Sequence, residues 1–159
     1  MKHAYDEMYL EDAMENMGEM VDYAVNVWHM DIDEFWKLFL SSGMADEFAK
    51  GSPRAVCGLS GVEMMYTVLH KVGIEEKEFP IQIEYGRSRE YWSGWILAYY
   101  QWLTGKRFQD IYAGMNMKEI QRLYPTLHEA SEEKFVEVAD KIIEKNINSI
   151  KIQRMRKKC

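Results

Sequence analysis

Residues Tyr91–Trp102 read YWSGWILAYYQW, and six of these twelve positions are aromatic. Only Ser93, Gly94 and Gln101 interrupt the apolar residues from the first tryptophan of this segment to Leu103. A helix that is apolar on every side is usually buried on every side, so the segment predicts a central core helix. The alternative is an anchor for a binding surface. The tyrosine hydroxyls and indole N–H groups need hydrogen-bond partners, so we expect some of them to reach the surface.

The residues around this segment define its ends and its packing. Ser88 is placed to cap the start of the helix, and Gly105 is placed to end it. A glycine in a helix interior, such as Gly94, lowers the stability of the helix by about 1 kcal/mol relative to alanine. We therefore expect Gly94 to allow another helix to approach closely.

Helical spacing of apolar residues continues through most of the chain. Residues 6–28 carry one such stripe, and we expect a long first helix whose outer face is acidic. Capping residues predict further helix starts at Asp31, Ser60 and Ser131, and Pro125 is expected to stop a helix. Residues 74–87 form the most loop-like segment, in which Ile81 and Ile83 suggest the only possible strand.

These patterns predict an all-α fold, in which about seven or eight helices form a single compact domain around the central aromatic helix. We assign residues 1–145 to the helical domain and residues 146–159 to a basic C-terminal helix or tail. The chain has 159 residues, of which 47% are apolar and 29% charged, as expected for one globular domain. Its two cysteines do not form a disulfide framework, which favours the cytoplasm, and Cys57 is expected to be a buried structural thiol.

Charge is distributed unevenly along the chain. Residues 1–50 contain twelve acidic and three basic residues, whereas residues 145–159 contain six basic residues and no acidic one. Two such ends can serve different partners, and the alternative is an ordinary solvated surface. No stretch approaches the roughly 18 apolar residues of a membrane span, so no membrane partner is expected.

Motifs of common enzymes are absent from the sequence. The four histidines are far apart, no CxxC or HExxH pattern occurs, and no glycine-rich phosphate loop occurs. We therefore expect no catalytic residues, no metal site and no cofactor, and we interpret the protein as a non-enzymatic binding module. A site assembled only in the fold remains the alternative.

The candidate partner-binding residues come from the acidic first helix and from the end of the loop before the aromatic helix. They are Glu11, Glu15, Glu19, Asp22, Tyr85, Arg87, Arg89 and Tyr91. The candidate residues for weak, non-specific nucleic-acid contact come from the basic end of the chain. They are Lys151, Arg154, Arg156, Lys157 and Lys158.

Three blocks together resemble a known group of proteins: residues 5–25, RSREYWSGWILAYYQWLTGKRFQDI at 87–111, and LYPTLHEASEEKFVEVADKII at 123–143. They resemble the N-terminal region of Firmicutes helix-turn-helix regulators that look like antitoxins of mobile elements. In those proteins a segment similar to IQRMRKKC leads into a DNA-binding domain, whereas this sequence stops at Cys159. The resemblance thus implies a partner-binding module, either a shortened form or a natural stand-alone one.

The first functional hypothesis is therefore a protein that neutralises or regulates a partner protein. The partner would be a toxin or a nucleic-acid-binding defence enzyme, as for an anti-CRISPR inhibitor, and acidic residues would steer a basic partner. The second hypothesis is a fragment of a transcriptional regulator that contacts DNA through the basic tail or through a missing helix-turn-helix domain. The sequence does not indicate the oligomeric state.

Overall fold

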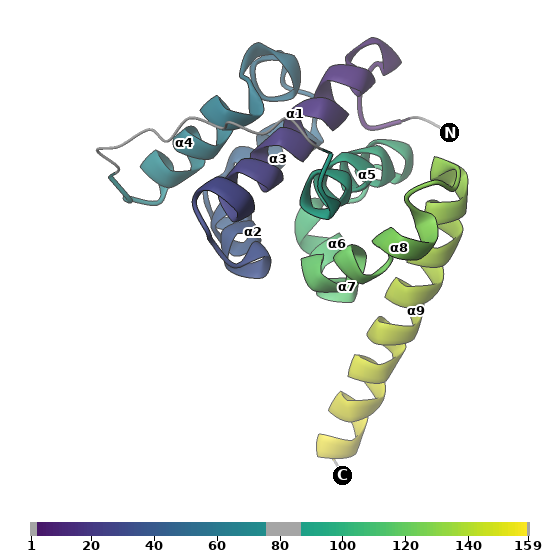
Figure 1. Ribbon diagram of the computed structural model, residues 1–159. Coiled ribbons are helices and arrows are strands. Elements are labelled where there is room, and N and C mark those ends of the chain that lie inside the picture. The colour runs from purple at the N-terminus through teal and green to yellow at the C-terminus, as the bar shows by residue number, and fades with distance from the viewer. Residues whose placement is uncertain (1–2, 76–86, 159) are drawn as a thin grey trace.

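Helices α1 (Leu10–Asp22) and α5 (Arg89–Thr104) pack against each other at the centre of the fold (Figure 1). The computed structural model describes residues 3–75 and 87–158. A Cβ atom added to Gly94 of α5 would lie 2.5 Å from the carbonyl oxygen of Met17, and one added to Gly18 of α1 would lie 2.9 Å from the carbonyl oxygen of Tyr91. The two glycines therefore bring the backbones of α1 and α5 together. The predicted close approach at Gly94 is confirmed.

The remaining helices surround this pair, and the predicted all-α class is confirmed. Nine α-helices lie in the described residues, which contain no strand; the possible strand at Ile81 and Ile83 lies outside them. The other seven are α2 (Ile32–Ser41), α3 (Met44–Ala49), α4 (Gly61–Lys71), α6 (Phe108–Gly114), α7 (Met117–Arg122), α8 (Tyr124–Leu127) and α9 (Glu132–Lys157). Three short segments have 3₁₀ or π geometry: Glu7–Tyr9, Tyr23–Val27 and Arg54–Gly58.

The predicted helix starts are confirmed, because the side chains of Asp31, Ser60, Ser88 and Ser131 each accept a backbone N–H of the helix that follows. The expected long first helix is one uninterrupted helical run from Glu7 to Val27, in which a 3₁₀ turn precedes α1 and a π turn follows it. Pro125 does not stop a helix. It lies in the first turn of α8, where the missing N–H of proline costs no hydrogen bond.

Two interior contacts connect helices that are distant in sequence. Gln101 of α5 is 1% exposed, and its side-chain amide donates to the carbonyl oxygens of Ala49 and Lys106, both at 3.1 Å. The buried carboxylate of Asp33 in α2 accepts the backbone N–H of Met117 at the start of α7 at 2.8 Å. The Gln101 NH₂ group and the Asp33 carboxylate are thus paired in the interior, whereas the Gln101 side-chain oxygen is buried without a hydrogen-bond partner. The paired groups connect α5 to the end of α3 and α2 to the start of α7.

Cys57 is exposed, so the prediction of a buried thiol is wrong. It lies on the outer side of the π turn Arg54–Gly58, whose inward residues are Ala55 and Val56. Its thiol donates to the carbonyl oxygen of Pro53 at 3.2 Å.

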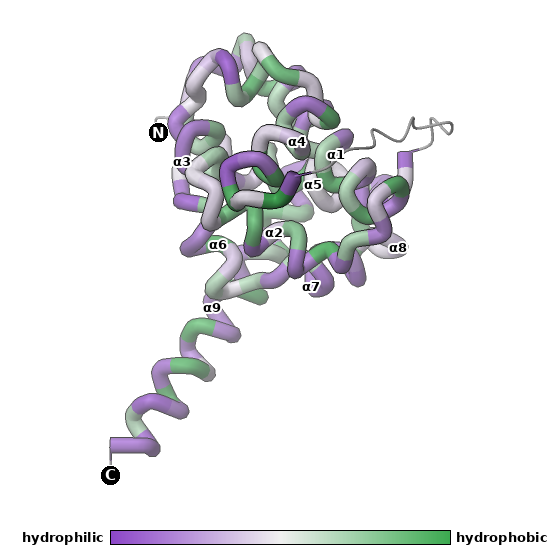
Figure 2. Tube along the Cα trace, turned by 90° about the vertical axis from the view of Figure 1, so that its left-hand side faces the viewer, coloured by the Kyte–Doolittle hydropathy of each residue, from purple (hydrophilic) through white to green (hydrophobic). Residues whose placement is uncertain are grey.

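Helix α9 packs against the domain with its first half only. Phe135, Ala139 and Ile143 are buried, and Ile143 fills the space that a Cβ atom at Gly114 would occupy. The Asn146 amide donates to the carbonyl oxygen of Gly114 at 2.8 Å, at the place where α9 leaves the domain. Residues 148–158 are exposed and extend away from the other helices (Figures 1 and 2). We call them the projecting end of α9; the assigned boundary at 145/146 therefore falls within one continuous helix.

Replacing Gly94 by alanine tests the contact between α1 and α5. Alanine favours the helix by about 1 kcal/mol, but its methyl group would lie 2.5 Å from the Met17 carbonyl oxygen. We expect the clash to dominate and to lower the free energy of unfolding by about 1–3 kcal/mol in urea titrations. The exposed Lys37→Ala substitution in α2 is the control and should be nearly neutral. A Gly94→Ala protein more stable than the wild type would contradict the close contact.

Candidate functional site

An open groove of about 710 Å³ lies between α1, α5 and the first turn of α9. We call it the acidic–aromatic groove. Its lining combines large apolar side chains with five carboxylates. The lining residues are His3, Glu7, Leu10, Glu11, Met14, Glu15, Arg87, Trp95, Tyr99, Trp102, Leu103, Glu132 and Glu133.

The aromatic helix α5 supplies the floor of this groove. Tyr91, Trp95 and Tyr99 follow one another at intervals of four residues, so they share one side of the helix, and all three are half-buried. Trp92 and Tyr100 point into the core and are buried. The same helix therefore serves as both core and surface.

The N-terminal segment closes the groove at the far end of α5. The indole N–H of Trp102 donates to the carbonyl oxygen of Tyr5 at 2.8 Å, and the backbone N–H of Ala4 donates to the carbonyl oxygen of Trp102 at 2.9 Å. The ring of His3 stacks on Trp102 with 3.8 Å between centroids. These contacts hold the residues before α1 against the floor.

Carboxylates form both walls of the groove. Glu7, Glu11 and Glu15 are spaced by four along one side, and Glu132 and Glu133 of α9 are on the other. Burial raises the pKa of the Tyr99 hydroxyl, and the carboxylates of Glu133 and Glu132 raise it further. The Tyr91 pKa is raised by burial and by Glu15, against the opposing effect of Arg87. The negative potential of the walls thus extends over the aromatic floor.

A smaller pocket of about 140 Å³ adjoins the groove and shares Arg87 and Trp95 with it. Its other lining residues are Tyr91, Trp92, Tyr124 and His128. The rings of Tyr124 and His128 stack with 4.3 Å between centroids, so the pocket is largely aromatic. It offers a place for one apolar side chain beside the Arg87 guanidinium.

Four of the predicted partner-binding residues lie together. Glu11, Glu15 and Arg87 line the groove, and Tyr91 lines the adjoining pocket. Arg89 is exposed outside both, and its guanidinium lies 3.5 Å from the carboxylate of Glu90. Tyr85 lies outside the described residues.

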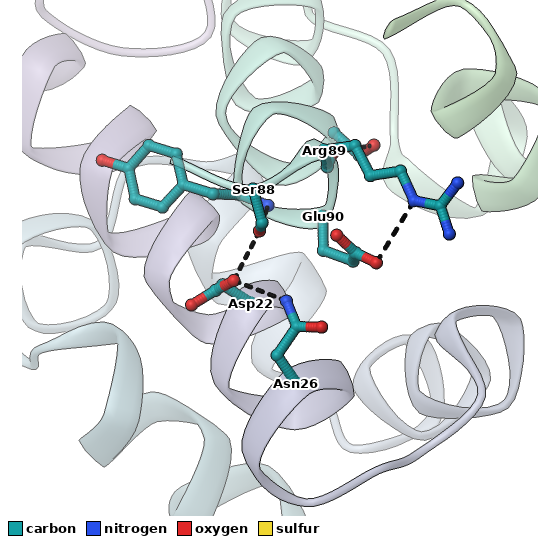
Figure 3. Close-up of polar contacts among 7 residues, drawn as sticks. Asp22, Asn26, Ser88, Arg89 and Glu90 are labelled. Atoms are coloured by element: carbon teal, nitrogen blue, oxygen red, sulfur yellow. Dashed lines mark hydrogen bonds and ion pairs between the residues drawn. The ribbon is translucent and has the colours of Figure 1, made fainter. Parts of the chain in front are cut away.

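Asp22 is 4% exposed, so the prediction that it lies on a partner-binding surface is wrong. Its carboxylate accepts the Ser88 hydroxyl at 2.5 Å and the Asn26 amide at 2.7 Å (Figure 3). The Ser88 oxygen in turn accepts the backbone N–H of Tyr91 at 3.0 Å. Asp22 therefore joins the end of α1 to the start of α5 rather than facing a partner.

Glu19 also points away from the groove. Its carboxylate accepts the backbone N–H of Val62 at 3.3 Å, near the start of α4. Gly61 packs against this part of α1, because a Cβ atom there would lie 2.5 Å from the carbonyl oxygen of Asn16. Glu19 thus contributes to the contact between α1 and α4.

The five basic residues selected for nucleic-acid contact are all exposed on the projecting end of α9. No group of three or more His, Cys, Asp or Glu side chains in the described residues could hold a metal ion. None of the helices in that part of the chain is long and apolar enough to cross a membrane.

Sequence reasoning missed much of the groove. The spacing of Trp95 and Tyr99 from Tyr91 could have placed them on one side of a helix. Nothing in the sequence indicated that Glu132 and Glu133 would face Glu11, because that proximity depends on how α9 packs.

Comparisons with protein-family models, curated proteins and solved structures found no match.

The two serine caps Ser88 and Ser131 allow a matched test of the Asp22 contact. Ser131→Ala removes a cap and should lower the free energy of unfolding by about 1 kcal/mol. Ser88→Ala removes a cap and also one donor to the buried Asp22 carboxylate, so a loss of about 2–3 kcal/mol is expected. Urea titration of both proteins measures the difference. Equal losses would show that the hydrogen bond between Ser88 and Asp22 contributes nothing.

Proposed function

We propose that the protein is a non-enzymatic module that neutralises or regulates a partner protein by binding a basic, partly apolar segment of it in the acidic–aromatic groove. The observation that supports this most directly is the combination of five glutamates with the exposed sides of Trp95 and Tyr99. Apolar area gives affinity, and the surrounding carboxylates select a cationic partner and speed its approach.

The lining favours a peptide segment over a small ligand. The groove is open, its volume is about 710 Å³, and its two acidic walls come from different helices. An amphipathic helix carries apolar and basic side chains on adjacent faces, so it could contact the floor and both walls at once. One apolar side chain of that segment could enter the adjoining pocket beside Arg87.

Basic segments of this kind are common in proteins that hold nucleic acid. Covering such a segment would block the phosphate-binding surface of a toxin or of a defence enzyme. This agrees with the resemblance to antitoxin-like regulators of mobile elements and with an inhibitor of the anti-CRISPR type. The proposed location is the cytoplasm, where such partners act.

A second candidate function is DNA contact by a regulator fragment. It is favoured by the exposure of Lys151, Arg154, Arg156, Lys157 and Lys158 on one projecting helix. Because these contacts would be to phosphates, binding should be independent of sequence and should weaken steeply with salt.

Charge reversal in the groove tests the first proposal. Glu11→Lys with Glu15→Lys should abolish capture of the partner from lysate of the source cells, because it places positive charge beside a basic segment. Asp12→Lys with Glu75→Lys is the matched control, since both residues are exposed outside the groove and the net charge change is the same. Quantitative mass spectrometry of the captured proteins is the measurement. A partner retained equally by both variants would place its binding site elsewhere.

An electrophoretic mobility shift at low salt tests the second candidate. If the projecting end binds DNA, the wild-type protein should shift unrelated duplexes equally, and Arg154→Glu with Lys157→Glu should remove the shift. The absence of any shift by the wild-type protein at low salt would exclude DNA binding by this chain.

A further inference from the structure

The projecting end of α9 carries large apolar side chains that are exposed. Five large apolar residues are exposed in the described residues, and three of them lie here: Ile150 at 40%, Ile152 at 51% and Met155 at 69%. Basic residues stand between and beside them. A helix end with this composition is suited to a partner surface that is both apolar and acidic.

The acidic–aromatic groove has the complementary chemistry. Its walls carry five carboxylates, whereas the projecting end carries five basic side chains between Lys151 and Lys158 and no acidic one. Its floor exposes parts of Trp95 and Tyr99, against which Ile152 and Met155 could be buried. The two surfaces therefore carry opposite charge, and both expose apolar side chains.

One chain cannot bring these two surfaces together by itself. The first turn of α9 contributes Glu132 and Glu133 to the groove, and the basic residues lie at the other end of the same continuous helix. A helix of 26 residues is about 39 Å long. The groove can therefore receive only the projecting end of another molecule.

We infer that the groove binds the projecting end of α9 from a second copy of this chain. Two antiparallel α9 helices place the basic end of each beside the acidic first turn of the other. If Arg154 of each copy lies opposite Glu133 of the other, the twofold axis passes near Glu144. Both contacts between Arg154 and Glu133 then form at once, and the dimer is closed and symmetric.

This inference rests on the proposed function, because it assigns a regulator to the same groove. The projecting end would imitate the basic segment of the partner. Self-association would then close the groove at high protein concentration and release it on dilution or when a tighter partner competes. Since the contacts are small and rich in charge, we expect a weak, salt-sensitive dimer.

Sedimentation velocity of the full chain over a range of concentrations tests the inference. The wild-type protein should shift from monomer to dimer as concentration rises in low salt, and added salt should reverse the shift. Glu11→Lys with Glu15→Lys, and separately Arg154→Glu with Lys157→Glu, should each remain monomeric. An equimolar mixture of these two variants should recover the dimer, because the groove and the end that were not changed remain complementary and the changed pair is complementary again.

A second substitution separates the apolar contribution from charge. Ile152→Ser with Met155→Ser should weaken the dimer by at least about tenfold while leaving urea unfolding of the monomer unchanged, since both side chains are exposed. Asp12→Lys with Glu75→Lys is the charge-matched control and should dimerise as the wild type does.

The outcomes distinguish this inference from the proposed function. A wild-type chain that stays monomeric at its highest soluble concentration in low salt overturns self-association, and partner capture by the groove can still succeed. A dimer that survives the groove substitutions but not the end substitutions also overturns the inference, because the end then binds elsewhere. A monomer that binds DNA through the same end supports the second candidate function instead. Recovery of the dimer in the mixture, with capture of no partner, supports self-association alone.

Discussion

The contact between the backbones of α1 and α5 is the constraint on which the rest of this structure depends. Gly94 lies against the carbonyl oxygen of Met17, and Gly18 lies against that of Tyr91. No side chain separates the helices there, so the direction of α5 relative to α1 has little freedom. The buried Asp22 carboxylate then joins the end of α1 to the cap of α5. Every other helix packs around a pair whose geometry is already fixed.

This arrangement explains how one aromatic segment serves two purposes. Trp92 and Tyr100 face the core, where the rings of both lie edge-on to Phe135 of α9. Trp95 and Tyr99 face the groove, with the acidic residues of α1 beside them. Because α1 and α9 flank α5 on different sides, their carboxylates form two opposed walls over an aromatic floor. The groove is thus a direct result of the way these three helices pack.

The all-α class, the caps at Asp31, Ser60, Ser88 and Ser131, and the close approach at Gly94 were predictable from sequence. Each depends on residues within one turn or on helical spacing. The burial of the Asp22 carboxylate was not predictable, because it depends on a hydrogen bond from Ser88, which is 66 positions away. The same reason applies to the wall formed by Glu132 and Glu133. The sequence predicted an acidic surface at Glu11 and Glu15 but not the surface that faces it.

Helix α9 is one continuous helix that carries two functional features. Its first turn supplies Glu132 and Glu133 to one wall of the groove, and its other end is the exposed basic segment. The first half of the helix packs against the domain, and near the end of that half the Asn146 amide donates to the carbonyl oxygen of Gly114 and to the carboxylate of Glu119. Residues 148–157 continue the same helix beyond that point and are exposed. The packing of Phe135, Ala139 and Ile143 therefore sets two things at once: where the acidic wall stands and the direction in which the basic end points.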